Sequence, residues 1–253
     1  MAHRPIRSLQ HEYERYVEQE IEAYKESVPR SVLLGIGDEA VASLAKAEQF
    51  TLTELIVWEE VDRIIARRLR LPSATTWRRR RLKAIEELRR PERWGMSAKH
   101  PLVRGVKGAT EGTALVAGAV DESPTLYLAA NGCRVTAIDE EPEAVDRVMH
   151  AALRAGLTDR IDARVGGLES WSPDSPLFAV IVSDAALATL TSEERQRVLE
   201  TLQRATIDGG VHLVQALAGR ELSELRAFYA GWTVQVDNST SKTNGFLATK
   251  SAH

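Results

Sequence analysis

A glycine and an acid at a fixed spacing are the first candidates for chemistry in this chain. Gly118 ends one short apolar run, and Asp139 ends a second run 21 positions later. The residues between them are typical of a turn and a helix, so the pattern predicts a strand, a turn, a helix and a strand that closes on a carboxylate. In doubly wound α/β folds, an acid about 20 residues beyond such a turn hydrogen-bonds ribose hydroxyls. The spacing therefore predicts a ribose-binding site over Gly118, with Asp139 on the ribose.

Other common chemistries find no support in the sequence. No two of the six histidines have the helical spacing of metal ligands, so we expect no metal site. There is no G-x-S-x-G nucleophile elbow and no G-x-x-x-x-G-K-[ST] phosphate loop. The single cysteine, Cys133, excludes an internal disulfide framework, and we expect it to be a small buried residue.

Composition and charge bound the class of protein. The chain has 253 residues, a length that suits two modest domains or one large one, and its 43% of hydrophobic residues can supply a real core. No apolar run approaches the ~20 residues that cross a bilayer, and residues 1–10 lack the apolar centre of a signal peptide. We expect a soluble, cytoplasmic protein without a membrane partner.

The net charge of −3 conceals one strongly basic segment. Residues 63–99 carry 13 Lys and Arg against 3 Asp and Glu. The favoured interpretation is a solvated helix face that pairs with the acidic helix expected at residues 12–26. The alternative is a nucleic-acid site, which would use four consecutive arginines, Arg78, Arg79, Arg80 and Arg81.

The first hundred residues are predicted to be helical. Apolar spacings of three and four predict helices over 9–26, from 31 or 38 to 46, from about 51 to 71, and over 75–90. Thr51 and Glu54 form a capping box for the third helix, and Trp58, Trp77 and Trp94 are expected to be core or interdomain anchors. A glycine-rich stretch at 95–112 then marks a linker. The expected domains are a helical, cap or partner-binding domain at 1–100 and an α/β domain at 101–253.

Strands and helices alternate beyond the linker, which favours a parallel sheet. The predicted strands are 113–117, 134–138, 161–165, 178–183, 211–217, 233–236 and 245–249. The predicted helices are 124–130, 142–155, 192–205 and 221–229, with a capping box at Thr191 and Glu194 and a C-terminal cap at Gly156. The last two strands leave no room for a helix between them and should form an antiparallel hairpin. The predicted fold is a doubly wound, mostly parallel, seven-stranded α/β sheet with a C-terminal antiparallel hairpin, preceded by an all-α domain.

This layout resembles the class I S-adenosylmethionine-dependent methyltransferases over residues of about 110–253. In that family the first strand runs into a G-x-G-x-G turn, and the second strand ends in the acid that holds the ribose. The segment LVAGAVDESPTLYLAANGCRVTAIDEEP fits this pattern without a gap, with Gly118 on the first glycine and Asp139 on the acid. The segment TIDGGV at 206–211 is similar to the family's turn before the fifth strand.

The resemblance implies an S-adenosylmethionine site and a set of residues around it. The implied cofactor-binding residues are Gly118, Ala119, Asp139, Glu140, Gly167, Leu168 and Ser183. Asp184, at the end of the fourth strand, is the candidate catalytic residue, which would orient a substrate or accept a proton. The alternative for Asp184 is that it caps the turn that follows.

Three departures from the family pattern bear on the cofactor. Val120 and Glu122 replace the second and third glycines of the turn, so side chains stand where the family's backbone approaches the methionine part. Val116 stands where the family often has an acid, and no acid follows the third strand. Asp121 or Glu122 would instead face the cofactor's positive amino group.

The expected function is S-adenosylmethionine-dependent methyl transfer, with a small molecule as acceptor. Two alternatives stay open: a non-catalytic methyltransferase-fold scaffold, and a nucleic-acid methyltransferase that uses the arginine-rich helix. The helical domain is also a candidate surface for a homodimer.

Overall fold

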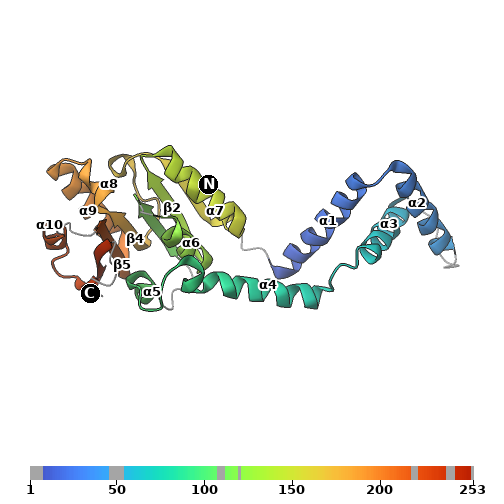
Figure 1. The fold of residues 1–253 in the computed structure, drawn as a ribbon, viewed down its shortest axis with the longest axis horizontal. Coiled ribbons are helices and arrows are strands. Elements are labelled where there is room, and N and C mark those ends of the chain that lie inside the picture. Colours follow the sequence, from blue (N-terminus) through green and yellow to red (C-terminus); the bar gives the residue numbers. More distant parts are fainter. Residues whose placement is uncertain are drawn as a thin grey trace. The chain divides into compact units, whose positions relative to one another are not determined.

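The computed structural model describes residues 8–45, 54–106, 112–118, 121–217, 222–237 and 243–251 (Figure 1). The chain divides into two compact units, Met1–Ala84 and Ile85–His253. The sequence placed this boundary at residue 100, whereas in the structure residues 85–100 pack with the second unit. None of the described helices is long and apolar enough to span a membrane.

The first unit consists of helices, as the sequence predicts. They are α1 (Leu9–Ser27), α2 (Arg30–Ala45), α3 (Glu54–Arg68) and the start of α4 (Ala74–Arg89). α2 continues through Gly35 and Gly37, which the sequence took as a weak start, while Thr51 of the expected capping box lies outside the described residues. A small core joins α1, α2 and α3 through Ile21, Ile36, Ala40, Val61, Ile64 and Ile65.

Aromatic and ionic contacts bring α1 to α4 within this unit. Trp77 of α4 packs against Tyr13 and Tyr16 of α1, with ring centroids 5.6 and 6.1 Å apart. Arg81 donates from Nε to a carboxylate oxygen of Glu12 at 3.0 Å, in the pairing expected between the basic and acidic helices. Trp58 differs from the expectation of a core anchor, because it is more than half exposed.

The second unit is built on one seven-stranded sheet with the order β3-β2-β1-β4-β5-β7-β6. The strands are β1 (Gly112–Ala117), β2 (Cys133–Asp139), β3 (Ile161–Val165), β4 (Leu177–Ser183), β5 (Thr206–Leu217), β6 (Thr233–Asp237) and β7 (Thr243–Thr249). β1 to β5 are parallel, and β7 is antiparallel to both β5 and β6. The predicted fold class, including the C-terminal hairpin, is confirmed.

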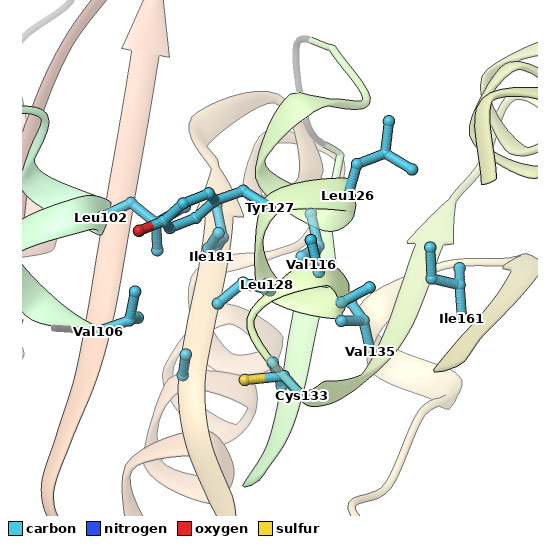
Figure 2. Packing of buried hydrophobic residues seen from close by; sticks show 14 of the residues in the cluster. Leu102, Val106, Val116, Leu126, Tyr127, Leu128, Cys133, Val135, Ile161 and Ile181 are labelled. Carbon is cyan, nitrogen blue, oxygen red and sulfur yellow. The ribbon is translucent and has the colours of Figure 1, made fainter. Parts of the chain in front are cut away.

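Helices cover both faces of this sheet. On one face α5 (Pro101–Gly105), α6 (Ser123–Ala130) and α7 (Pro142–Ala155) pack against the strands, and Figure 2 shows Leu102, Tyr127 and Leu128 meeting strand residues. On the other face lie α8 (Asp184–Ala188), α9 (Ser192–Ala205) and α10 (Ser223–Ala227). Cys133 is buried in the first of these cores, as expected, and burial raises the pKa of its thiol to about 11.

Local signals in the sequence account for several helix ends. Gly156 ends α7 in the left-handed region at φ 67°, and Thr191 with Glu194 forms the capping box of α9. α5 and α8, each of five residues, were not predicted. Such short helices carry too few turns for an apolar periodicity to appear in the sequence.

A buried polar chain fixes His212 in the middle of β5. Thr206 Oγ1 donates to the carbonyl of Leu202 at 2.7 Å, so it accepts from His212 Nε2 at 2.7 Å. His212 Nδ1 then accepts from the Tyr229 hydroxyl at 3.0 Å. Both histidine nitrogens are satisfied in the neutral form, and burial lowers the pKa of His212 to about 3.

Candidate functional site

The sheet order brings three predicted site residues to one edge. β1 lies between β2 and β4, and all three strands run parallel. Their carboxyl ends, Gly118 after β1, Asp139 of β2 and Ser183 of β4, therefore lie side by side, where α/β folds bind ligands. Ala119 and Val120, the next residues of the turn, lie outside the described residues.

At Gly118 the end of β1 contacts both β2 and α8. Its φ of 60° lies in the left-handed region, and its N–H donates to the carbonyl of Ile138 in β2 at 3.0 Å. A Cβ built on Gly118 would stand 2.6 Å from Ser183 Oγ and 2.7 Å from Ala186 Cβ. Both the backbone conformation and the close approach of α8 therefore require glycine at this position.

Asp139 closes β2 and is partly buried. Its Oδ1 accepts from the N–H of Glu141 at 2.9 Å, which holds the carboxylate at the strand end. Its carbonyl accepts from the N–H of Gly166 at 2.9 Å, which ties β2 to the turn after β3. The backbone N–H of Glu141 thus positions the carboxylate.

Glu140, the residue after Asp139, contacts the segment that follows α8. Its Oε1 accepts from Thr189 Oγ1 at 3.2 Å, just beyond the C-terminal end of α8. Because β1 lies between β2 and β4, this bond passes across the carboxyl end of β1. The sequence identified Glu140 but not Thr189.

Ser183 and Asp184, at the junction of β4 and α8, have different roles. Ser183 is buried, and its Oγ accepts from the N–H of Ala186 at 3.2 Å, so Ser183 is the N-cap of α8. Asp184 is partly buried in the first turn of α8, where a carboxylate is stabilised by the helix N-terminus. Ser183, rather than Asp184, therefore makes the cap.

Gly167 and Leu168 follow β3. Leu168 is buried in the sheet core, so only its backbone is available to a ligand. A Cβ built on Gly167 would stand 2.3 Å from a carboxylate oxygen of Glu169. The Glu169 carboxylate thus lies directly against the Gly167 backbone.

A small cavity opens beside this edge, between the N-terminus of α6 and α7. Its volume is about 30 Å³, and its lining includes Asp121, Glu122, Thr125, Asp139 and Arg147. Thr125 Oγ1 is fully buried and makes no hydrogen bond to any of the described residues. The sequence offered one hint to Thr125, a hydroxyl within an apolar buried helix, and none to Arg147.

A wider groove lies between α9 and α10. Its volume is about 390 Å³, and it is lined by Ser192, Arg195, Glu224, Ala227 and Phe228. Arg195 donates to the carbonyls of Leu187 at 3.2 Å and Leu190 at 3.4 Å, so its guanidinium is held against the C-terminal end of α8. No group of three or more His, Cys, Asp or Glu side chains in the described part of the chain could hold a metal ion.

The strand order, the antiparallel β7 and the acid at the end of β2 define a domain of the class I methyltransferase type. Residues 118–210 match the family model described as a methyltransferase domain. The resemblance inferred from the sequence is thereby confirmed for this segment.

Comparison with solved structures finds methyltransferases of low sequence identity to this chain. The chain is similar to an N-methyltransferase, NodS, from Bradyrhizobium japonicum WM9, with a TM-score of 0.49 and 15% identity over 62% of this chain and 100% of that one. It is similar to an rRNA methylase from Streptococcus thermophilus, with a TM-score of 0.49 and 13% identity over 62% and 100%. It is also similar to magnesium protoporphyrin IX methyltransferase from Synechocystis PCC 6803, with a TM-score of 0.48 and 16% identity over 59% and 76%. No curated protein matches significantly.

Proposed function

We propose that this protein is an S-adenosylmethionine-dependent methyltransferase that acts on a small molecule. The observation that carries the proposal is the juxtaposition of Gly118 and Asp139 at the ends of adjacent parallel strands, within the segment that matches a methyltransferase domain. Asp184 flanks them on the other side, at the end of β4.

The residues present fit the two polar ends of the cofactor. Asp139 would accept hydrogen bonds from the ribose hydroxyls, because only its Oδ1 is engaged by the backbone among the described residues. Asp121 and Glu122, which line the cavity beside Asp139, would face the cofactor's ammonium group. These carboxylates would accept hydrogen bonds from that ammonium group, a contact of a different kind from the backbone approach of the family's glycine-rich turn.

S-adenosylmethionine would supply an electrophilic methyl group. The protein would then have to orient the acceptor toward this methyl group and exclude water. Asp139 would orient the ribose end, and the Glu140–Thr189 bond would cover the end of β1. Asp184 would accept the proton that the acceptor releases at its carboxylate.

The groove between α9 and α10 supports a small-molecule acceptor. Its volume of about 390 Å³ lies within the ~300–1,000 Å³ of ordinary ligand pockets. Arg195 and Glu224 would recognise charged groups of the acceptor, and Phe228 would contact its apolar part. Because Arg195 binds the end of α8, the groove adjoins the helix that begins at Asp184.

Calorimetric titration of the full chain with S-adenosylhomocysteine tests the proposal. We expect Asp139→Ala to weaken binding at least about tenfold, since a desolvated charge-assisted hydrogen bond contributes about 1.5–3 kcal/mol. Glu143→Ala, an exposed acid four positions away in the first turn of α7, is the matched control and should bind like the parent. A parent that binds neither S-adenosylmethionine nor S-adenosylhomocysteine would instead support the scaffold alternative.

One observation keeps a nucleic-acid acceptor as the second candidate. Arg78, Arg79 and Arg80 are exposed on α4, and no carboxylate of the described residues forms an ion pair with them, whereas Arg81 is paired with Glu12. Binding to RNA or DNA that falls steeply with salt would favour this candidate.

A further inference from the structure

Helix α8 lies against the edge formed by Gly118 and Asp139 and carries a residue of the proposed reaction. Asp184, the proposed proton acceptor, is in the first turn of α8. Ala186, two residues later, packs on the end of β1, because a Cβ built on Gly118 would stand 2.7 Å from the Ala186 Cβ. The position of α8 therefore sets where the proposed proton acceptor stands relative to the glycine turn.

The segment that follows α8 is joined to the neighbouring strand end. Thr189, the residue after α8, donates from Oγ1 to a carboxylate oxygen of Glu140 at 3.2 Å. Glu140 in turn follows Asp139, the proposed ribose acid, directly in the chain. A displacement of the C-terminal end of α8 would therefore also disturb the strand end that carries the ribose acid.

α8 needs contacts from outside to hold its position. It has only five residues, Asp184–Ala188, and helices this short are not stable by themselves in water. Leu187 anchors it in the core, and Ser183 caps its N-terminus by accepting from the N–H of Ala186 at 3.2 Å. The last carbonyls of a helix have no partner within the helix, so the C-terminal end of α8 requires donors from another segment.

Arg195 of α9 supplies donors at this end. Its Nε donates to the carbonyl of Leu187 at 3.2 Å, and its Nη2 donates to the carbonyl of Leu190 at 3.4 Å. A guanidinium at the C-terminal end of a helix bonds the last carbonyls and also interacts favourably with the helix dipole. One side chain thus joins α9 both to the end of α8 and to the segment that follows it.

The place of Arg195 within α9 does not favour α9 itself. Arg195 is the fourth residue of the helix, near the N-terminus, where a positive charge opposes the helix dipole. Glu193 and Glu194, in the first turn of α9, have the sign that this end prefers. The capping box of Thr191 and Glu194 fixes the start of α9 and so determines where Arg195 emerges. The contacts with α8 therefore account for an arginine at this position.

We propose that Arg195 is a positioning residue for methyl transfer: its guanidinium holds α8, and with it Asp184 and Ala186, against the edge at Gly118. This role rests on the proposed function, since the position of Asp184 matters to catalysis only if the edge binds the cofactor. Arg195 also lines the groove between α9 and α10. The same side chain therefore connects the proposed acceptor groove to the helix that carries the proposed proton acceptor.

Amide hydrogen exchange of the full chain, measured residue by residue by NMR, reports how firmly α8 is held without any ligand. The reporters are the N–H of Ala186, which donates to Ser183 Oγ, and the N–H of Leu190, which donates to the carbonyl of Leu187. Arg195→Met keeps a long apolar stem and removes the donors. It should raise both exchange rates at least about tenfold, because two hydrogen bonds from a charged group are lost.

Two control variants separate this effect from a general loss of stability. Arg197→Met removes the same kind of side chain from α9, but Arg197 is exposed and donates to the carbonyl of Glu193 within α9. Gly156→Ala destabilises the left-handed end of α7 and leaves the contacts of α8 intact. Because α8 would open locally, both controls should exchange at Ala186 and Leu190 like the parent.

Saturating S-adenosylhomocysteine gives a readout that a purely structural contact would not change. If α8 in its held position completes the cofactor edge, the ligand binds that state and stabilises it. The N–H of Ala186 should then exchange at least about tenfold more slowly with ligand than without it, in the parent and in Arg195→Met.

Three results would overturn the positioning role. They are α8 amides that exchange alike in Arg195→Met and the parent, an equal acceleration by Arg197→Met, and bound S-adenosylhomocysteine that leaves exchange in α8 unchanged. A parent that binds no S-adenosylhomocysteine in the calorimetric titration would refute the proposed function, and with it any role of Arg195 in methyl transfer. The two failures are distinguishable, because exchange in the free protein is measured without ligand and still shows whether Arg195 holds α8.

Discussion

Replacing Gly118 with alanine is the sharpest test of the edge described above. The structure gives two separate reasons why alanine should be destabilising. Gly118 has a φ of 60°, and an alanine held in this left-handed conformation is destabilised by about 1–2 kcal/mol. Its Cβ would also overlap Ser183 Oγ and Ala186 Cβ, and inserting a methyl group into a packed site costs about 1–3 kcal/mol.

Gly156→Ala separates these two contributions. Gly156 has φ 67°, but a Cβ built there would meet nothing within 4 Å. Alanine at position 156 therefore carries the cost of the positive φ but no steric overlap. The small gain from a less flexible unfolded chain is the same for both variants. We expect the two variants to differ by about 1–3 kcal/mol in the free energy of unfolding, with Gly118→Ala the less stable.

Urea unfolding of the sheet unit, followed by circular dichroism, measures this difference. Ala186→Gly should cost less in the Gly118→Ala background than in the parent, because it removes one of the two overlapping atoms. Equal destabilisation by Gly118→Ala and Gly156→Ala would refute the close packing of α8 on Gly118. The backbone conformation alone would then account for glycine at the end of β1.

Two further predictions concern charge. Because burial lowers the pKa of His212 from 6.5 to about 3, the unfolded chain binds more protons between these values, and stability should fall by about 1.4 kcal/mol per pH unit below about 6.5 and be unaffected by this group above it. Urea unfolding at pH 7 and pH 5 should show about 2 kcal/mol less pH dependence in His212→Gln than in the parent, while the exposed-site control His150→Gln should behave like the parent. For the basic helix, changing Arg78, Arg79 and Arg80 together to alanine should leave an already weak affinity for labelled RNA or DNA nearly unchanged at physiological salt. A submicromolar dissociation constant that this change abolishes would contradict the small-molecule proposal and favour a nucleic-acid acceptor.

The sequence predicts the sheet and the two anchors of its edge because those features are local. Apolar runs bounded by turn residues place the strands, and Gly118 and Asp139 are strand ends whose spacing follows from one turn and one helix. The residues that meet them across the edge follow from tertiary packing instead. Thr189 reaches Glu140 from 49 positions away, and Arg147 joins the cavity from a different helix.

Trp58 shows a different limit of sequence patterns. Its spacing with Val61 and Ile65 correctly indicates an apolar face on α3. Periodicity identifies such a face but does not say whether the same chain covers it, and here the core stops at Val61 while Trp58 remains exposed. Trp58 instead lies beside Lys25 of α1, whose ammonium stands 5.9 Å from the centroid of the indole ring.

The contacts at the edge also explain how a domain with an altered glycine turn could still orient a reaction. Gly118 is joined to β2 through Ile138 and packs against α8, and Glu140 is joined to Thr189 at the far end of α8. The acid proposed to hold the ribose and the acid proposed to accept a proton therefore stand on elements that contact each other directly. Since methyl transfer depends on alignment more than on covalent help from the protein, we propose that this connection compensates for part of what the missing glycines provide in the family pattern. Loss of the Glu140–Thr189 bond should accordingly disturb the alignment of the two ends more than the stability of the fold, because both side chains are exposed.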